Sequence, residues 1–240
     1  MTYRIFADKE LLGLAAAALF EEAAASSIAA HGHFSVCLSG GSTPNTMFKL
    51  LADAPYRTNI DWAKVHVFWG DERCVPLDSE KNNAFNAHQL LLSKVPIPSD
   101  QIYRINGSGD PAIGAQQYAS TLKSFFGEAK PQFDLVFLGM GDDAHTASLF
   151  PETTILEKTT DWVKSVFVPK LDTHRISLTP ILINQAKQIT FLIGGTNKVE
   201  ALKNVVNGPD NTTLYPSQLI IRGGGNVSLY LDNAAAQAIW

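Results

Sequence analysis

The stretch "FDLVFLGMGDDAH", residues 133–145, joins an apolar run to a glycine-rich polar junction. The run "FDLVFL" has the composition of a strand that is buried on both faces. The junction that follows contains two glycines, two aspartates and a histidine. A buried strand that leads through a polar junction into a helix is the repeating unit of a parallel sheet, so this stretch indicates an α/β fold.

The same pattern recurs along the chain. Strand-like runs that end in polar junctions are "FSVCLSGG" (34–41), "VHVFWGDE" (65–72) and "QITFLIGG" (188–195), and "NVSLYLD" (226–232) is a late strand. Helical patterns follow the junctions in "STPNTMFKLLAD" (42–53), "NAFNAHQLLL" (83–92) and "TNKVEALKNVV" (196–206). This alternation predicts a mostly parallel sheet with helices on both faces. Since the carboxyl ends of parallel strands share one edge, the polar junctions form a composite site if their strands are neighbours.

Composition and charge indicate a globular protein with a mildly acidic surface. The chain has 240 residues and a formal net charge of -4, and no basic cluster points to nucleic acid. Its two cysteines, Cys37 and Cys74, form no CxxC motif and are expected to be reduced thiols. No uninterrupted apolar run reaches the length of roughly 18 residues that a membrane span needs. The amino-terminal residues lack a secretory pattern. We therefore expect a cytoplasmic protein without a membrane partner.

The junction "LSGGSTP", residues 38–44, is a candidate phosphate site. Its glycines and the start of the following helix offer free backbone N–H groups, and Ser42 and Thr43 add hydroxyls. The simpler alternative is a capped turn without a ligand, with Ser42 or Thr43 as the cap. The Lys-Ser/Thr ending of a nucleotide triphosphatase loop is missing.

Further charged side chains fall near the same edge. Asp71 and Arg73 follow the strand of residues 65–69, where a carboxylate can hold sugar hydroxyls and an arginine can hold a phosphate or an oxyanion. Arg175 and Lys198 are single cations beside strand and helix signals and can close over a phosphate. Taken alone, Asp71 and Arg73 are equally compatible with a surface salt-bridge cluster, and single cations such as Arg175 and Lys198 are usually solvated surface charges.

The junction at residues 139–145 allows two interpretations. Gly139, Gly141 and Ala144 match a dinucleotide fingerprint, but two aspartates in that turn would repel a pyrophosphate. The alternative is catalytic: His145 can accept a proton from water, and Asp143 can orient its ring. We favour the catalytic interpretation. The chain has no HExxH motif and no Cys/His cluster, so no catalytic metal is expected.

Taken together, "LSGGSTP", "VHVFWGDERCVP", "FDLVFLGMGDDAHTASLFP", "RISLT" and "GGTNKVEAL" resemble the bacterial 6-phosphogluconolactonases. The resemblance runs in order from about Phe34 to Leu202. It implies a single domain over residues 1–240 with a modified Rossmann-like α/β/α sandwich. It also implies hydrolysis of 6-phospho-D-glucono-1,5-lactone to 6-phospho-D-gluconate in the oxidative pentose phosphate pathway, without a cofactor.

The resemblance also implies roles for individual residues. It implies His145 as the general base, with Asp71, Arg73 and Asp143 around the reacting end of the lactone. The implied phosphate ligands are Gly40, Gly41, Ser42, Thr43, Arg175 and Lys198. Two positions depart from the family pattern: Ala144 stands where glycine is usual, and Asn45 where arginine is frequent. The sequence leaves open whether Asp143 or Asp71 orients His145.

Three alternatives remain at this stage. The related glucosamine-6-phosphate deaminases carry a glutamate where this chain has Phe150, so a deaminase-like isomerase lacks an acid–base group here. A phosphosugar-binding relative without catalysis and a nucleotide-dependent oxidoreductase are the other two. The expected partner is a small phosphosugar lactone, and the expected state is a monomer or weak homodimer.

Overall fold

The computed structural model describes residues 1–239. Its main sheet has six strands in the order β1-β9-β8-β5-β2-β3, and every pair within it is parallel. Along the sheet, the strands are β1 (Thr2–Phe6), β9 (Val227–Asp232), β8 (Gln188–Ile193), β5 (Leu135–Leu138), β2 (Phe34–Leu38) and β3 (Val65–Trp69). The predicted mostly parallel sheet is confirmed, and the strands of the four polar junctions are neighbours as the composite site requires.

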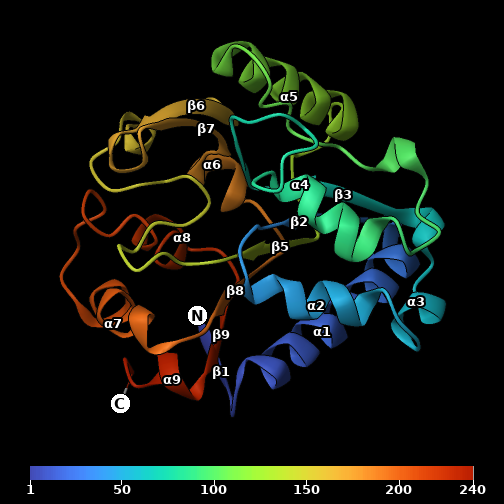
Figure 1. Ribbon diagram of the computed structural model, residues 1–240, viewed down its shortest axis with the longest axis horizontal. Helices are drawn as coiled ribbons and strands as arrows, with labels where there is room; N and C mark the ends of the chain where they lie inside the picture. The colour runs from blue at the N-terminus through green and yellow to red at the C-terminus, as the bar shows by residue number, and fades with distance from the viewer. Residues whose placement is uncertain (240) are drawn as a thin grey trace.

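Helices flank the main sheet, except that α5 (Pro111–Phe126) packs against β6 (Val163–Val168) and β7 (Thr173–Leu178), which lie outside it (Figure 1). The helices are α1 (Lys9–His31), α2 (Thr43–Leu51), α3 (Tyr56–Asn59), α4 (Asn83–Ala87), α5 (Pro111–Phe126), α6 (Pro180–Ile183), α7 (Val199–Asn207), α8 (Gln218–Ile221) and α9 (Asn233–Ala236). The α/β class predicted from the alternating pattern is therefore confirmed. The helix expected over residues 83–92 is α4 continued by a π-helical turn, His88–Leu92.

The longest helix, α1, is apolar enough in length and composition to be a candidate membrane span, alone among the helices of residues 1–239. Its buried side includes Leu12, Ala16 and Phe20, and it packs against α2 and the strands β1, β2 and β9. This packing is that of a core helix, which passes the same test of composition.

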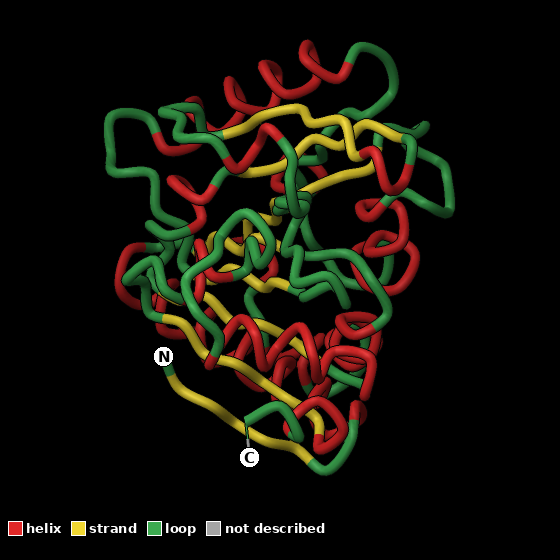
Figure 2. Tube along the Cα trace, turned by 90° about the vertical axis from the view of Figure 1, so that its left-hand side faces the viewer, coloured by secondary structure: helices red, strands yellow, loops and turns green. Residues whose placement is uncertain are grey.

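A second sheet of three antiparallel strands was not predicted. Its order is β4 (Asp71–Arg73), β7 (Thr173–Leu178) and β6 (Val163–Val168), and Figure 2 shows it at a different level from the main sheet, beneath α5. Asp71 and Arg73 were expected in a loop after β3 but lie in β4. Since β7 carries Arg175, this sheet brings Arg73 and Arg175 together at the edge of the main sheet.

Candidate functional site

All of the side chains and glycines predicted for the site line one cleft of about 730 Å³ at the carboxyl edge of the main sheet. The ten predicted residues are Gly40, Gly41, Ser42, Thr43, Asp71, Arg73, Asp143, His145, Arg175 and Lys198. They come from the junctions after β2, β3, β5 and β8 and from β7 of the small sheet. The topology therefore gathers residues that are far apart in the sequence.

The loop after β2 leaves its polar groups free. Gly41 has φ 101°, a left-handed conformation that glycine adopts without strain. Ser42 is exposed at the N-cap of α2, yet its hydroxyl makes no capping hydrogen bond in the described chain. Pro44 occupies the first turn and removes one N–H that would need a partner. The alternative of a turn capped by Ser42 is therefore not observed, and the Ser42 hydroxyl remains available to an anion.

Arg73 and Arg175 are directly paired across β4 and β7. Like charges in register across two strands repel each other, while the carboxylate of Asp71 acts on Arg175 in the opposite, favourable direction. Among residues 1–239, neither arginine forms an ion pair with a carboxylate, and the buried Nε of Arg175 has no hydrogen-bond partner. Burial lowers the pKa of Arg175. The two guanidinium groups are therefore suited to negatively charged groups of a ligand in the cleft.

His145 and Asp143 form a hydrogen-bonded pair. The Nδ1 atom of His145 lies 2.5 Å from Oδ1 of Asp143, and Lys170 donates to Oδ2 of the same carboxylate at 2.8 Å. Burial acts to raise the pKa of Asp143, but the hydrogen bonds from His145 and Lys170 outweigh it and hold that pKa well below its usual range. An ionised Asp143 accepts a hydrogen bond from Nδ1–H, so the ring proton stays on Nδ1 and Nε2 is the nitrogen with a free lone pair.

The glycine of the fingerprint makes room for this pair. A Cβ on Gly141 would overlap Nδ1 of His145 and lie 2.5 Å from Oδ1 of Asp143. The ring of His145 also stacks on Phe150, with centroids 4.0 Å apart and planes 20° apart. The imidazole is thus held between Gly141 and Phe150. The glycine is needed here because any side chain at position 141 would overlap the His145 ring.

Asp71 does not orient His145. Its Oδ2 atom accepts a hydrogen bond of 2.6 Å from Ser148, and its backbone carbonyl accepts one from Asn83. The question that the sequence left open is answered by these contacts, because the carboxylate in contact with His145 is Asp143. His174, which adjoins Arg175, lies exposed against Phe167 with ring centroids 5.0 Å apart.

Glu72 is fully buried behind the cleft. Its carboxylate accepts hydrogen bonds from the backbone N–H groups of Arg73, Asn83 and Ala84, which tie β4 to the start of α4. Burial raises the pKa of Glu72 to about 7 from an ordinary 4.5, although these three hydrogen bonds act to lower it.

Stability is expected to fall as the pH rises from about 5 to about 7, because the folded state holds the Glu72 proton more tightly than the unfolded chain. The contribution of the Glu72 proton to the free energy of unfolding is fully present below the pKa of the unfolded chain. It amounts to about 3 kcal/mol in total. Glu72→Gln removes this titration. Urea unfolding at several pH values should show the difference between wild type and Glu72→Gln changing with pH, while the exposed neighbour Glu80→Gln should run parallel to wild type. Parallel curves for Glu72→Gln would refute the assignment.

The two departures from the family pattern have structural answers. Ala144 adopts φ 63°, and its carbonyl accepts hydrogen bonds from the backbone N–H and the hydroxyl of Ser217. The position therefore has the left-handed conformation at which glycine would be unstrained. The side-chain oxygen of Asn45 accepts a hydrogen bond from Asn86, so this side chain is committed to α4.

Ala144→Gly is expected to change the free energy of unfolding by less than about 1 kcal/mol, because opposing effects cancel. Glycine relieves about 1 kcal/mol of backbone strain but loses a buried methyl worth about 0.8 kcal/mol and gains freedom in the unfolded chain. Denaturant unfolding measures the change, and Ala147→Gly, also at positive φ, is the matched control. A loss above about 2 kcal/mol would mean that the loop depends on the methyl group.

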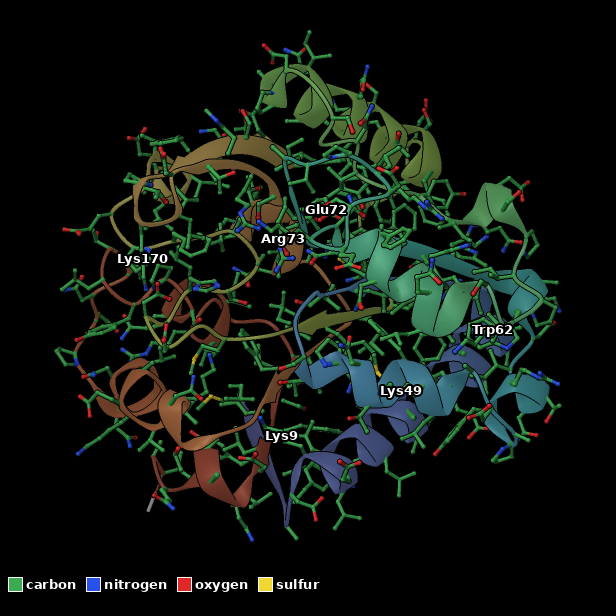
Figure 3. The ribbon with its side chains drawn as sticks, in the orientation of Figure 1. Lys9, Lys49, Trp62, Glu72, Arg73 and Lys170 are labelled. Atoms are coloured by element: carbon green, nitrogen blue, oxygen red, sulfur yellow. The ribbon has the colours of Figure 1, made fainter. Side chains whose placement is uncertain are left out.

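Sequence reasoning missed two lysines of the cleft. Lys9 begins α1, and Lys170 lies in the turn between β6 and β7; Figure 3 labels Lys170 at the left, Lys9 below the centre and Arg73 above the centre. A Cβ on Gly194 would lie 3.0 Å from the side chain of Lys9. The absence of a side chain at Gly194 therefore leaves room for the Lys9 side chain to extend into the cleft. A lone surface lysine has no local signal that could have identified either residue.

The sequence model of the family described as glucosamine-6-phosphate isomerases/6-phosphogluconolactonase matches residues 7–229. The chain belongs to this family. A curated 6-phosphogluconolactonase of Haemophilus influenzae is 37% identical over 204 residues, which cover 85% of this chain and 87% of that protein. A curated 6-phosphogluconolactonase of Nostoc is 38% identical over 209 residues, covering 85% and 84%.

Solved structures agree with this placement. The 6-phosphogluconolactonase of Trypanosoma cruzi superposes with a TM-score of 0.88 at 26% identity, covering 98% of this chain and 96% of that one. A monomeric glucosamine-6-phosphate deaminase has a TM-score of 0.82 at 18% identity, covering 99% and 100%, and this likeness concerns the fold alone.

Proposed function

We propose that this protein hydrolyses 6-phospho-D-glucono-1,5-lactone to 6-phospho-D-gluconate, the lactonase step of the oxidative pentose phosphate pathway. The observation that carries the proposal is the His145–Asp143 pair in the same cleft as the glycine loop and two arginines that form no ion pair within residues 1–239. The curated relatives that bear this activity in their names support it. The catalytic unit is a single domain over residues 1–240, and the reaction needs no cofactor. The protein works in the cytoplasm as a soluble monomer or weak dimer.

The phosphate of the substrate binds at one end of the cleft. Backbone N–H groups of Gly40 and Gly41 and the hydroxyls of Ser42 and Thr43 surround it at the start of α2, where the helix dipole favours an anion. Arg175 and Lys198 supply the opposing positive charge. Holding the phosphate there places the lactone ring toward His145.

His145 then acts on water. Its Nε2 takes a proton as the water oxygen attacks C1, and Asp143 stabilises the imidazolium through Nδ1–H. Arg73 stabilises the negative oxygen of the tetrahedral intermediate. As the bond from C1 to the ring oxygen breaks, the imidazolium returns the proton to that oxygen. The products are the C5 hydroxyl and the C1 carboxylic acid, and the acid then releases its proton to solvent, which gives 6-phospho-D-gluconate.

The deaminase alternative is disfavoured by Phe150. Its ring stacks on His145 at the position where the deaminases carry a glutamate, so the second acid–base group for ring opening is missing there. The direct experiment is an assay of the wild type on freshly generated 6-phosphogluconolactone, on the unphosphorylated lactone and on glucosamine 6-phosphate. We expect hydrolysis of the phosphorylated lactone well above the spontaneous rate. Ammonia release from glucosamine 6-phosphate without lactonase activity would reverse the choice.

Arg175→Met is expected to raise KM for the phosphorylated lactone by about 10- to 100-fold, since a charge-assisted hydrogen bond contributes about 1.5–3 kcal/mol. The value of kcat should change much less, because Arg175 binds the phosphate equally in ground and transition states. Steady-state kinetics measure the split. His174→Ala, on the same strand, serves as the control and should leave KM unchanged. An equal KM effect on the unphosphorylated lactone would show that Arg175 does not bind the phosphate.

A further inference from the structure

The opposite, amino-terminal edge of the main sheet carries its own cluster of polar residues. His33, Asp134 and Lys187 each stand immediately before a strand, and these strands, β2, β5 and β8, are neighbours. His31 ends α1, and Gly32 with φ 90° turns the chain so that the rings of His31 and His33 lie 4.6 Å apart. The proposed function uses none of these residues, since they lie at the far ends of the strands that carry the cleft.

Asp134 is fixed in place from behind. Its side chain is almost fully buried, and Oδ2 accepts hydrogen bonds of 2.8 Å from both the backbone N–H and the hydroxyl of Ser35. The other oxygen, Oδ1, is left to face the cluster. Burial acts to raise the pKa of Asp134, but hydrogen bonds from Lys187 and Ser35 outweigh it and keep the group ionised at neutral pH. A carboxylate held by such outer contacts is a preorganised metal ligand.

Lys187 occupies the position of a cation among these groups. Its Nζ lies 2.7 Å from Oδ1 of Asp134 and 2.9 Å from Nε2 of His31, and Oδ1 and Nε2 are 2.9 Å apart. Ligand atoms bound to one metal ion at about 2.0–2.2 Å are separated by roughly 3 Å, so the two atoms already have the spacing of a metal site. Lys187 is half exposed, and its flexible side chain can leave toward solvent.

His33 completes the set. Ligand atoms of His31, His33 and Asp134 all lie within 4.8 Å of one another. Neutral imidazoles and a carboxylate are the ligands that Zn²⁺ and Ni²⁺ prefer.

We propose that His31, His33 and Asp134 bind a divalent transition-metal ion such as Zn²⁺, and that Lys187 is the internal cation this ion displaces. The ion would join the end of α1 to the starts of β2 and β5, which stabilises the fold away from the cleft. This differs from the expectation of no catalytic metal, because the site lies at the edge opposite His145 and takes no part in lactone hydrolysis.

The test is calorimetric titration of the full-length protein with Zn²⁺, without other ligands. His33→Ala should weaken one site by at least about tenfold, and Lys187→Met should tighten the same site by about tenfold, because it removes the competing charge. His88→Ala, a partly buried histidine elsewhere, should change nothing. The double variant His31→Ala/His33→Ala keeps the Lys187–Asp134 ion pair, so it tests the site even if Lys187→Met does not fold.

A second readout locates the ion. Paramagnetic Ni²⁺ should broaden the imidazole NMR signals of His31 and His33 and leave that of His145 sharp. Zinc affinity that is unchanged in His33→Ala and in the double variant, or broadening confined to His145, would overturn the proposal.

Discussion

Replacing His145 with alanine is expected to lower kcat for 6-phosphogluconolactone by about 10³-fold, within the usual contribution of general-base catalysis. The loss follows from the geometry, because Nε2 of this ring is the basic nitrogen that Asp143 leaves free in the cleft. Stopped assays on freshly generated lactone, with spontaneous hydrolysis subtracted, measure the effect.

The variant should still bind 6-phosphogluconate, because the phosphate ligands lie on other elements. His174→Ala removes an exposed histidine near the cleft and should keep wild-type kcat. A His145→Ala variant with near-normal kcat would exclude His145 as the base. Loss of product binding as well would indicate that the substitution disturbs the cleft. The Asp143→Asn variant would then be the better test of the role of His145.

Asp143→Asn is expected to lower kcat by about 10²-fold or more with little change in KM. An amide can donate to Nδ1, which then places the ring proton on Nε2, and a protonated Nε2 cannot accept a proton from water. The variant also replaces the charged partner of Lys170, which lies at 2.8 Å, with a neutral amide oxygen.

The neighbouring Asp142→Asn is a matched control. This substitution also removes one negative charge, but the Asp142 side chain is 63% exposed, and its Oδ1 lies 3.9 Å from Nζ of Lys170. Its kcat should stay near that of wild type. If both variants lost the same activity, the effect would come from net charge in the cleft, and the orienting role of Asp143 would be wrong.

The parallel sheet and the composite site were predictable because their signals are local. Each buried strand is a short apolar run, and each junction carries glycines and polar groups that a core strand would exclude. The neighbouring order of β8, β5, β2 and β3 then brings Gly40, His145 and Lys198 to one edge.

Other features were not predictable, because they depend on tertiary contacts. The strand β4 is only Asp71–Arg73, three charged residues whose local pattern does not indicate a strand. Its pairing with β7 sets Arg73 beside Arg175, and no local pattern carries that register. The choice between Asp143 and Asp71 required the loop geometry that Gly141 permits.

The most direct test of this account is a crystal structure of the protein with 6-phosphogluconate bound. The account predicts the phosphate at Gly40–Thr43 with Arg175 and Lys198, and the C1 carboxylate within hydrogen-bond reach of His145 Nε2 and Arg73. A product bound in the reverse direction, with its phosphate at His145 and its carboxylate at the glycine loop, would contradict both the phosphate site and the role of His145 as the base.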